Sequence, residues 1–225
     1  RMNYFNADGS YGGMCGNGGR CSALFVFDSV QKNEVRFEAL DYIYSARKTS
    51  NSVTLSMKKP IDLQLNKEIE IEGKLFKYHY VNTGSPHVVI YEDDLPEIFR
   101  EEIQQKGIER LGGLVRYHDQ FKSEGTNVNL VSLLGNQSVK MRTYERGVEA
   151  ETLACGTGSV ACAVITSVIH DYPSPIQVQT HSNETLLVGF KKEVNQFTGI
   201  ELIGSAKVVF SSSVRYDLHN HQICS

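Results

Sequence analysis

Two short segments of this chain carry almost the same pattern, a cysteine followed directly by a Gly-x-Gly turn. They are residues 14–18, Met-Cys-Gly-Asn-Gly, and residues 154–158, Ala-Cys-Gly-Thr-Gly. Each runs into a segment rich in small and apolar residues, which is typical of a helix. Backbone N–H groups and the helix dipole at such a position favour a thiolate. The duplication therefore predicts two similar halves, each with a cysteine at the start of a helix, that face one another across one substrate.

The rest of the chain consists mainly of short runs that are typical of β-strands, such as residues 35–39, 52–57 and 207–210. Residues 93–106 begin with acidic residues and a proline, as helices often do. Many strands with one long apolar helix per half predict an α+β fold. We expect two similar domains, each a mixed or antiparallel sheet wrapped around a central apolar helix, with the active site in the cleft between them.

The expected boundary between the halves is the sequence Lys-Lys-Pro at residues 58–60, which interrupts the strand pattern. We assign residues 1–59 plus 205–225 to the first domain, where the end of the chain returns to complete it. Residues 60–204 form the second domain. The chain opens at Arg1 without an initiator methionine or a leader, so we expect its natural N-terminus to lie upstream and the first domain to be incomplete at that end.

Composition excludes several classes of function. The net charge is −3 and no basic stripe is present, so nucleic acid is not an expected partner. The longest apolar stretch, residues 154–169, is too short and too polar to span a bilayer, so we expect no membrane association. The chain has five cysteines, an odd number, which favours free thiols in a reducing compartment. We therefore expect a cytoplasmic protein.

Two thiols placed at helix starts can invert a stereogenic carbon. A carboxylate bound between the two Gly-x-Gly turns would meet backbone N–H groups from both helices. Cys15 and Cys155 would then reach the adjacent carbon from opposite faces, where one thiolate removes a proton and the other thiol delivers one. The helix dipoles would stabilise the negative charge that develops on the carboxylate. The pattern predicts an acid–base pair of cysteines.

Other interpretations of the cysteines stay open. A buried cysteine is more often a small apolar core residue than a catalyst, and this is our interpretation of Cys21, Cys162 and Cys224. For Cys15 and Cys155 the remaining alternative is a structural disulfide between them. A zinc site is disfavoured because the sequence has no Cys-x-x-Cys pair and no histidine at a suitable spacing.

Four motifs, in order along the chain, resemble those of the diaminopimelate epimerase family. They are residues 6–10 with 14–21, residues 83–87, residues 125–129, and residues 144–148 with 151–158. The resemblance extends over essentially the whole chain. It implies an isomerase that interconverts LL- and meso-diaminopimelate, without metal or pyridoxal phosphate, in lysine and peptidoglycan precursor biosynthesis. It also implies that no cofactor is needed.

The resemblance implies a role for each matching residue. Cys15 and Cys155 would be the catalytic acid and base, exchanging roles with the direction of reaction. The carboxylate at the reacting centre would be bound by Gly16, Asn17, Gly156 and Thr157. The distal amino and carboxylate groups would be bound by Asn6, Asn127, Glu145 and Arg146. His87 would lie near the reacting centre, and Ser85 stands where the family usually has asparagine. The family also has a longer N-terminal part, so whether this chain alone is active stays open.

The expected partner is a small-molecule amino-acid substrate, and a homodimer is left open. Two other functions also stay open. A proline or hydroxyproline racemase-type enzyme uses two cysteines as well, but it would not need the charged pair Glu145 and Arg146 for a long substrate. A non-catalytic amino-acid-binding or thiol-redox protein on the same scaffold would bind without exchanging the α-proton of its ligand.

Overall fold

The structure is a computed structural model that describes residues 1–5, 9, 11–49, 51–122, 125–194, 196–217, 219 and 222–224. The helices are α1 (Gly16–Val30), α2 (Glu97–Lys106), α3 (Glu109–Arg116) and α4 (Gly156–Ile169), with 3-10 turns η1 (Glu92–Asp94) and η2 (Asp119–Phe121). The strands are β1 (Tyr4–Phe5), β2 (Tyr11–Gly13), β3 (Glu34–Ala39), β4 (Tyr42–Lys48), β5 (Val53–Ser56), β6 (Ile61–Ile71), β7 (Lys74–Asn82), β8 (Pro86–Tyr91), β9 (Asn127–Gly135), β10 (Ser138–Glu145), β11 (Ala150–Thr152), β12 (Ile176–Gln179), β13 (Thr185–Glu193), β14 (Gln196–Gly204), β15 (Arg215–Asp217) and β16 (Gln222–Cys224).

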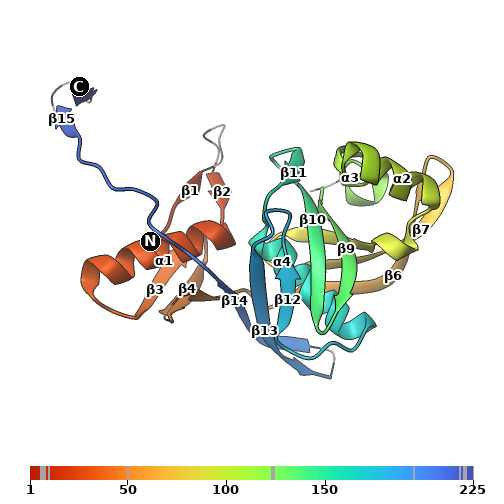
Figure 1. Ribbon diagram of the computed structural model, residues 1–225, viewed down its shortest axis with the longest axis horizontal. Coiled ribbons are helices and arrows are strands. Elements are labelled where there is room, and N and C mark those ends of the chain that lie inside the picture. Colours follow the sequence, from red (N-terminus) through yellow and green to blue (C-terminus); the bar gives the residue numbers. More distant parts are fainter. Residues whose placement is uncertain are drawn as a thin grey trace.

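Within the described residues, twelve strands form one continuous sheet in the order β3-β4-β5-β14-β13-β12-β10-β9-β8-β7-β6, with β11 paired to β10. The pairs β8–β9 and β10–β12 are parallel, and the other pairs are antiparallel. The sheet passes from one half of the molecule to the other through the antiparallel pair β5–β14 (Figure 1). The predicted α+β class with mixed sheets is confirmed.

Helix α4 lies inside the curved sheet of the second half, packed against strands β7 to β10 and β12 to β14 (Figure 1). Its residues Val160, Ala163 and Ile165 have no exposed surface. A helix that is apolar on all sides is stable only when it is surrounded. The small residues along α4 allow the strands to approach it closely, and the helix therefore forms the core of this half.

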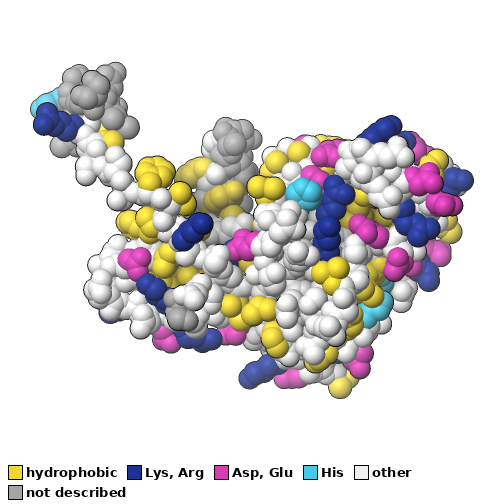
Figure 2. All heavy atoms as spheres, in the orientation of Figure 1, with side chains coloured by type: hydrophobic (Ala, Val, Ile, Leu, Met, Phe, Trp, Pro, Cys, Tyr) yellow, Lys and Arg dark blue, Asp and Glu magenta, His cyan; other side chains and the backbone are white. Residues whose placement is uncertain are grey.

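Helix α1 packs one face on β3, β4 and β5, with Ala23 and Phe27 buried. Its other face is exposed, and Phe25 has 71% of its surface accessible. Hydrophobic side chains accordingly gather over the α1 half in Figure 2, whereas charged side chains spread over the face that carries α2 and α3. Cys21, predicted to be a core residue, is exposed because it lies on the open side of α1. Cys162 of α4 is buried as expected.

The end of the chain differs from the expectation. Residues 205–214 have no regular secondary structure, so the strand predicted at 207–210 is wrong. A strand needs a neighbour that satisfies its backbone hydrogen bonds, and β15 finds that neighbour in β16, in a separate hairpin (Figure 1). The domain assignment stays a prediction, although the proposed boundary at 58–60 does fall between β5 and β6.

The helix predicted at 93–106 is shorter than expected. The 3-10 turn η1 comes first, and α2 begins only at Glu97, with Pro96 as its N-cap residue. The backbone before a proline favours an extended conformation, which Leu95 adopts with ψ 142°. No helix in the described part of the chain is both long enough and apolar enough to cross a membrane.

Candidate active site

The N-termini of α1 and α4 lie against one another. Gly16 and Gly156 are the first residues of the two helices. A Cβ atom placed on Gly156 would lie 3.2 Å from Cα of Gly16 and 2.9 Å from Cδ2 of Leu202. Such distances are too short for a side chain without movement of the neighbours. Glycine at both positions therefore lets the two helix starts meet.

Each helix is capped by the cysteine of its motif, with the same geometry. Cys15 has φ −114° and ψ 120°, and Cys155 has φ −123° and ψ 116°. The Sγ of Cys15 accepts a hydrogen bond from the N–H of Gly18 at 3.4 Å, and the Sγ of Cys155 accepts one from Gly158 at 3.4 Å. An extended residue whose side chain accepts from a first-turn N–H is the usual N-cap arrangement. The two thiols thus occupy equivalent positions at the two helix starts.

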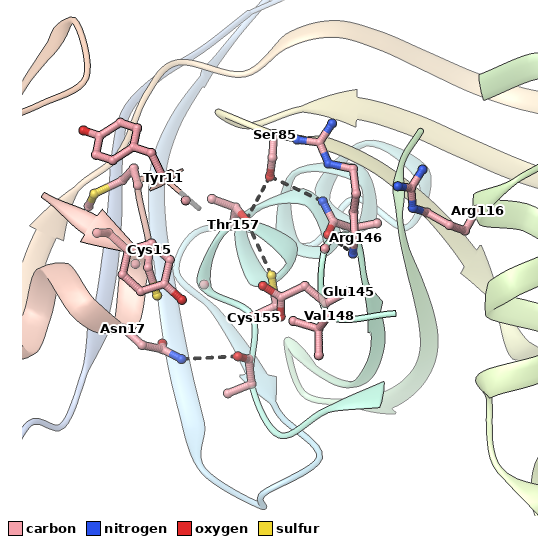
Figure 3. A pocket seen from close by; sticks show the side chains of 18 residues that line it. Tyr11, Cys15, Asn17, Ser85, Arg116, Glu145, Arg146, Val148, Cys155 and Thr157 are labelled. Carbon is pink, nitrogen blue, oxygen red and sulfur yellow. Dashed lines mark hydrogen bonds between the residues drawn. The ribbon is translucent and has the colours of Figure 1, made fainter. Parts of the chain in front are cut away.

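Both cysteines line one cavity of about 300 Å³ between the halves. This volume is at the small end of the range for small-molecule sites, roughly 300–1,000 Å³. Eight other predicted residues in the described part of the chain also line it: Gly16, Asn17, Ser85, Asn127, Glu145, Arg146, Gly156 and Thr157. Figure 3 shows Cys15 on one side of Cys155, and Arg146 and Arg116 on the other. Asn6 lies outside the described residues.

His87 is the predicted residue that does not line the cavity, because it is fully buried on β8. The Nδ2 group of Asn129 donates to Nδ1 of His87 at 3.1 Å and to the Val88 carbonyl at 2.8 Å. The Thr143 hydroxyl donates to Oδ1 of Asn129. These partners fix the amide orientation of Asn129. Since Nδ1 of His87 is an acceptor, its proton is on Nε2.

That Nε2–H points toward the cavity wall. The Nε2 atom of His87 lies 2.9 Å from Oγ1 of Thr157 and 3.0 Å from Oγ of Ser85. The Thr157 hydroxyl lies in turn 3.5 Å from Sγ of Cys155 (Figure 3). Burial, with the nearby charge of Arg146, lowers the pKa of His87 to about 3, so the ring is neutral. His87 therefore reaches Cys155 through Thr157 rather than by direct contact with a molecule in the cavity.

Asn127 joins β8 to the turn that begins at Arg146. Its Nδ2 group donates to the Pro86 carbonyl at 2.8 Å, and its Oδ1 accepts from the backbone N–H of Arg146 at 2.9 Å. Asn127 and Asn129 are two apart on β9, so their side chains point to the same face of the sheet. The first asparagine thus fixes the turn that carries Glu145 and Arg146, and the second fixes His87.

Comparison with known proteins identifies the family of this chain. The sequence model of the diaminopimelate epimerase family matches residues 79–209, more than half of the chain. The chain is 35% identical to the diaminopimelate epimerase of Aquifex aeolicus, over 93% of this chain and 72% of the relative. It is 38% identical to that of a Hydrogenobaculum species, over 96% of this chain and 75% of the relative. The chain belongs to the diaminopimelate epimerase family.

A solved structure supports the fold. The crystal structure of a hydroxyproline epimerase from Agrobacterium vitis, with bound trans-4-hydroxy-L-proline, superposes with a TM-score of 0.64. It is 16% identical, and the match covers 89% of this chain and 65% of that one. The fold is therefore shared beyond the diaminopimelate epimerase family.

The pKa of Cys155 in this epimerase-family site differs from the expectation. Burial, together with the charge of Glu145, raises the pKa of Cys155 to about 12, although the hydroxyl of Thr157 and the N–H of Gly158 act to lower it. The expectation that the helix start favours a thiolate does not hold for Cys155 in this conformation, because loss of solvent outweighs the helix. Burial also raises the pKa of Glu145, which the Thr152 hydroxyl partly opposes. Cys155 is a thiol at neutral pH.

A hydrogen bond joins the two halves at this cavity. The Nδ2 group of Asn17 on α1 donates to the carbonyl of Ala154 at 3.2 Å (Figure 3). Tyr4 of β1 lines the cavity, and its pKa is raised by the charge of Cys15, by burial, by Glu145 and by a hydrogen bond with Cys15. Tyr4 was not predicted as a site residue, because it precedes the first of the four motifs.

Arg116 is the second site residue that sequence reasoning missed. It is the last residue of α3, and its largely buried side chain lines the cavity. Nothing in the helix sequence distinguishes it from a solvated arginine. The signal lies elsewhere, in Gly125 of the 125–129 motif, against which the Arg116 guanidinium packs.

Among the described residues, no group of three or more His, Cys, Asp or Glu side chains could hold a metal ion.

Proposed function

We propose that this protein inverts the α-carbon of diaminopimelate, from LL to meso, by proton transfer between Cys15 and Cys155, as a step in lysine and peptidoglycan precursor biosynthesis. The observation that carries the proposal is the contact of two cysteine-capped helix N-termini at one cavity. Family membership gives the substrate, since the similar proteins are named diaminopimelate epimerases.

In the proposed reaction the α-carboxylate lies at the starts of α1 and α4. Gly16 and Gly156 line the cavity there, and both helix dipoles favour negative charge. As the α-proton leaves, charge moves from carbon onto this carboxylate, where the backbone N–H groups stabilise it. The helices therefore lower the barrier to forming the planar intermediate.

The two thiols lie on opposite sides of that intermediate. Cys155 enters the LL-to-meso turnover as a thiol, because burial keeps its proton in place. Cys15, as thiolate, removes the α-proton from one face, and Cys155 gives its proton to the other face. The S–H bond of Cys155 breaks as the new C–H bond forms, and the reverse turnover uses the same groups with their roles exchanged.

The distal end of the cavity accounts for a substrate that carries a second amino-acid group. Glu145 suits an ammonium group and Arg146 suits a carboxylate, which it can bind through two parallel N–H donors. Proline and hydroxyproline have no second charged centre that would use this pair. The likeness to the hydroxyproline epimerase concerns the fold alone, and we therefore favour diaminopimelate.

The test is epimerisation of LL-diaminopimelate by the full-length protein in reducing buffer, compared with Cys15→Ser and Cys155→Ser variants. Removal of a general acid or base lowers the rate by about 10²–10⁴-fold. The matched control is Cys162→Ser, a buried cysteine of α4 outside the cavity. Undiminished epimerisation after either active-site substitution would remove the two-thiol mechanism. Binding of diaminopimelate without α-proton exchange by the wild type would favour the non-catalytic alternative.

The remaining parts of the proposal concern context. Free thiols persist in a reducing compartment, so the cytoplasm is the proposed location. The proposed partner is the amino-acid substrate alone, without nucleic acid or membrane. Whether the protein pairs with a second copy is tested by its mass in solution.

A further inference from the structure

Arg116 and Arg146 share the distal end of the cavity. Arg116 comes from the last position of α3 and Arg146 follows β10, so separate elements bring the two guanidinium groups to one side of Cys155 (Figure 3). The side chain of Arg116 is only 15% exposed. A charge that is largely removed from water needs a partner of opposite sign.

The partner present, Glu149, holds Arg116 loosely. Nε and Nη2 of Arg116 lie 3.4 and 3.3 Å from one oxygen, Oε1. The backbone N–H of Gly147 donates to the same oxygen at 3.0 Å. Burial acts to raise the pKa of Glu149, but the Gly147 N–H, the Tyr117 hydroxyl and Arg116 hold it below its ordinary value. The carboxylate of Glu149 therefore has several donors besides Arg116.

A second pair in the same half shows what a tight arginine–carboxylate contact looks like. Nε and Nη2 of Arg142 lie 2.7 and 2.6 Å from the two separate oxygens of Glu151. In that fork-to-fork geometry, two N–H donors of the arginine meet the two oxygens of one carboxylate. Arg116, by comparison, makes longer contacts to one shared oxygen, and its capacity to bind a planar carboxylate is not used up by Glu149.

The guanidinium group of Arg116 is nevertheless held in place. Its Cζ lies 4.9 Å from the centre of the Tyr117 ring. On another side it packs against Gly125, where a Cβ atom would overlap Nη1. Gly125 also has φ +65°, a conformation that favours glycine. An arginine fixed in this way loses little further freedom when it binds a ligand.

We propose that Arg116 binds the distal carboxylate of the substrate together with Arg146, and that this second guanidinium makes the site specific for amino acids with a second carboxylate. This inference rests on the proposed function and deepens it. Because both contacts of Arg116 to Glu149 go to one shared oxygen, its guanidinium group keeps N–H donors for a carboxylate of the substrate. A ligand without that carboxylate would leave these donors of Arg116 unused.

The experiment measures dissociation constants of meso-diaminopimelate and L-lysine by calorimetry on the full-length protein. Lysine is the same molecule without the distal carboxylate. Arg116→Gln should weaken diaminopimelate binding by about 10- to 100-fold, the worth of one or two charged hydrogen bonds, and lysine binding by less than about twofold. Arg116→Lys keeps the positive charge but loses the two parallel N–H donors. Its dissociation constant for diaminopimelate should lie between those of wild type and Arg116→Gln. In turnover, the loss should appear mainly in KM.

Glu149→Gln is the matched control, because it breaks the same ion pair from the other side. If Arg116 binds substrate, this variant should bind diaminopimelate as tightly as wild type or more tightly. If Arg116 serves only to hold the turn through Glu149, both variants should lose affinity equally, and the inference is wrong. Equal weakening of lysine and diaminopimelate by Arg116→Gln would also overturn it. Absence of epimerisation by the wild type, with these binding differences intact, would contradict the proposed function and not the role of Arg116.

Discussion

Gly16 and Gly156 touch at the point where the two helices of the site begin, with the Cα of one 3.2 Å from where a Cβ of the other would lie. Their contact brings two helix N-termini and two cysteine caps to one cavity. The spacing of the thiols therefore depends on the absence of a side chain at these positions.

The first prediction is that Gly156→Ala separates the helices and lowers kcat/KM by at least about tenfold. The new methyl group would also meet Leu202, and overpacking of this kind costs about 1–3 kcal/mol of stability. Epimerase kinetics and urea denaturation check both effects. Gly113→Ala on α3 is the control. The nearest neighbour of its Cβ would be the Tyr144 hydroxyl at 3.7 Å, an ordinary contact, so stability should stay equal or rise.

The second prediction concerns the hydroxyl between His87 and Cys155. Thr157→Val keeps the shape of the side chain but removes the group that lies 2.9 Å from Nε2 of His87 and 3.5 Å from Sγ of Cys155. We expect kcat to fall by about 10-fold or more, because the proton of Cys155 loses a polar neighbour. Thr157→Ser should restore most of the activity. Equal rates for the valine and serine variants would contradict a role for the hydroxyl.

The third prediction is a loss of stability in acid that depends on His87. Its folded-state pKa of about 3 lies below the ordinary value of 6.5. In the unfolded chain His87 therefore binds a proton below pH 6.5, whereas in the folded chain it stays neutral down to about pH 3. The free energy of unfolding falls as the pH is lowered across this window. The loss from this group is on the order of 2 kcal/mol between pH 6.5 and pH 5.

Urea denaturation at pH 7 and pH 5 checks the effect of His87. In His87→Gln, which keeps a side-chain donor, the difference in unfolding free energy between the two pH values should shrink by about the same 2 kcal/mol. An unchanged pH difference in the variant would show that other groups cause the acid sensitivity.

The fourth prediction concerns thiol reactivity. Cys155 is buried and its raised pKa keeps it protonated, whereas Cys15 is partly exposed at the cavity. At pH 8, iodoacetamide should modify Cys15 before Cys155, and loss of activity should follow modification of Cys15. Mass spectrometry of peptides from a Cys21→Ser variant, which removes the exposed thiol of α1, checks the order. Faster labelling of Cys155 would contradict the burial of that thiol.

The sequence predicted the local features of this site well. A cysteine before Gly-x-Gly indicates a capped helix start, and both helices begin at the glycine after the cysteine. An N-cap can be predicted because it depends only on residues that are neighbours in the sequence. The mixed α+β class also follows from the strand patterns and the two apolar helices.

Features that depend on distant contacts could not be predicted in this way. The strand expected at 207–210 fails because pairing requires a partner, and sequence pattern alone does not supply one. The raised pKa of Cys155 results from enclosure by a curved sheet, which outweighs the helix start that the sequence shows. Arg116 reaches the cavity from α3 only because Gly125 of another segment makes room for it.

The most direct test of two thiols on opposite faces of one carbon is a short reaction of LL-diaminopimelate in D₂O, stopped well before equilibrium. The account predicts that meso product carries deuterium at the inverted carbon while the remaining LL substrate carries almost none, since the thiol that donates has exchanged with solvent and the thiolate that accepts is a different group. Meso product that retains the substrate's own hydrogen would mean that a single group removes and returns the proton, and would contradict the account.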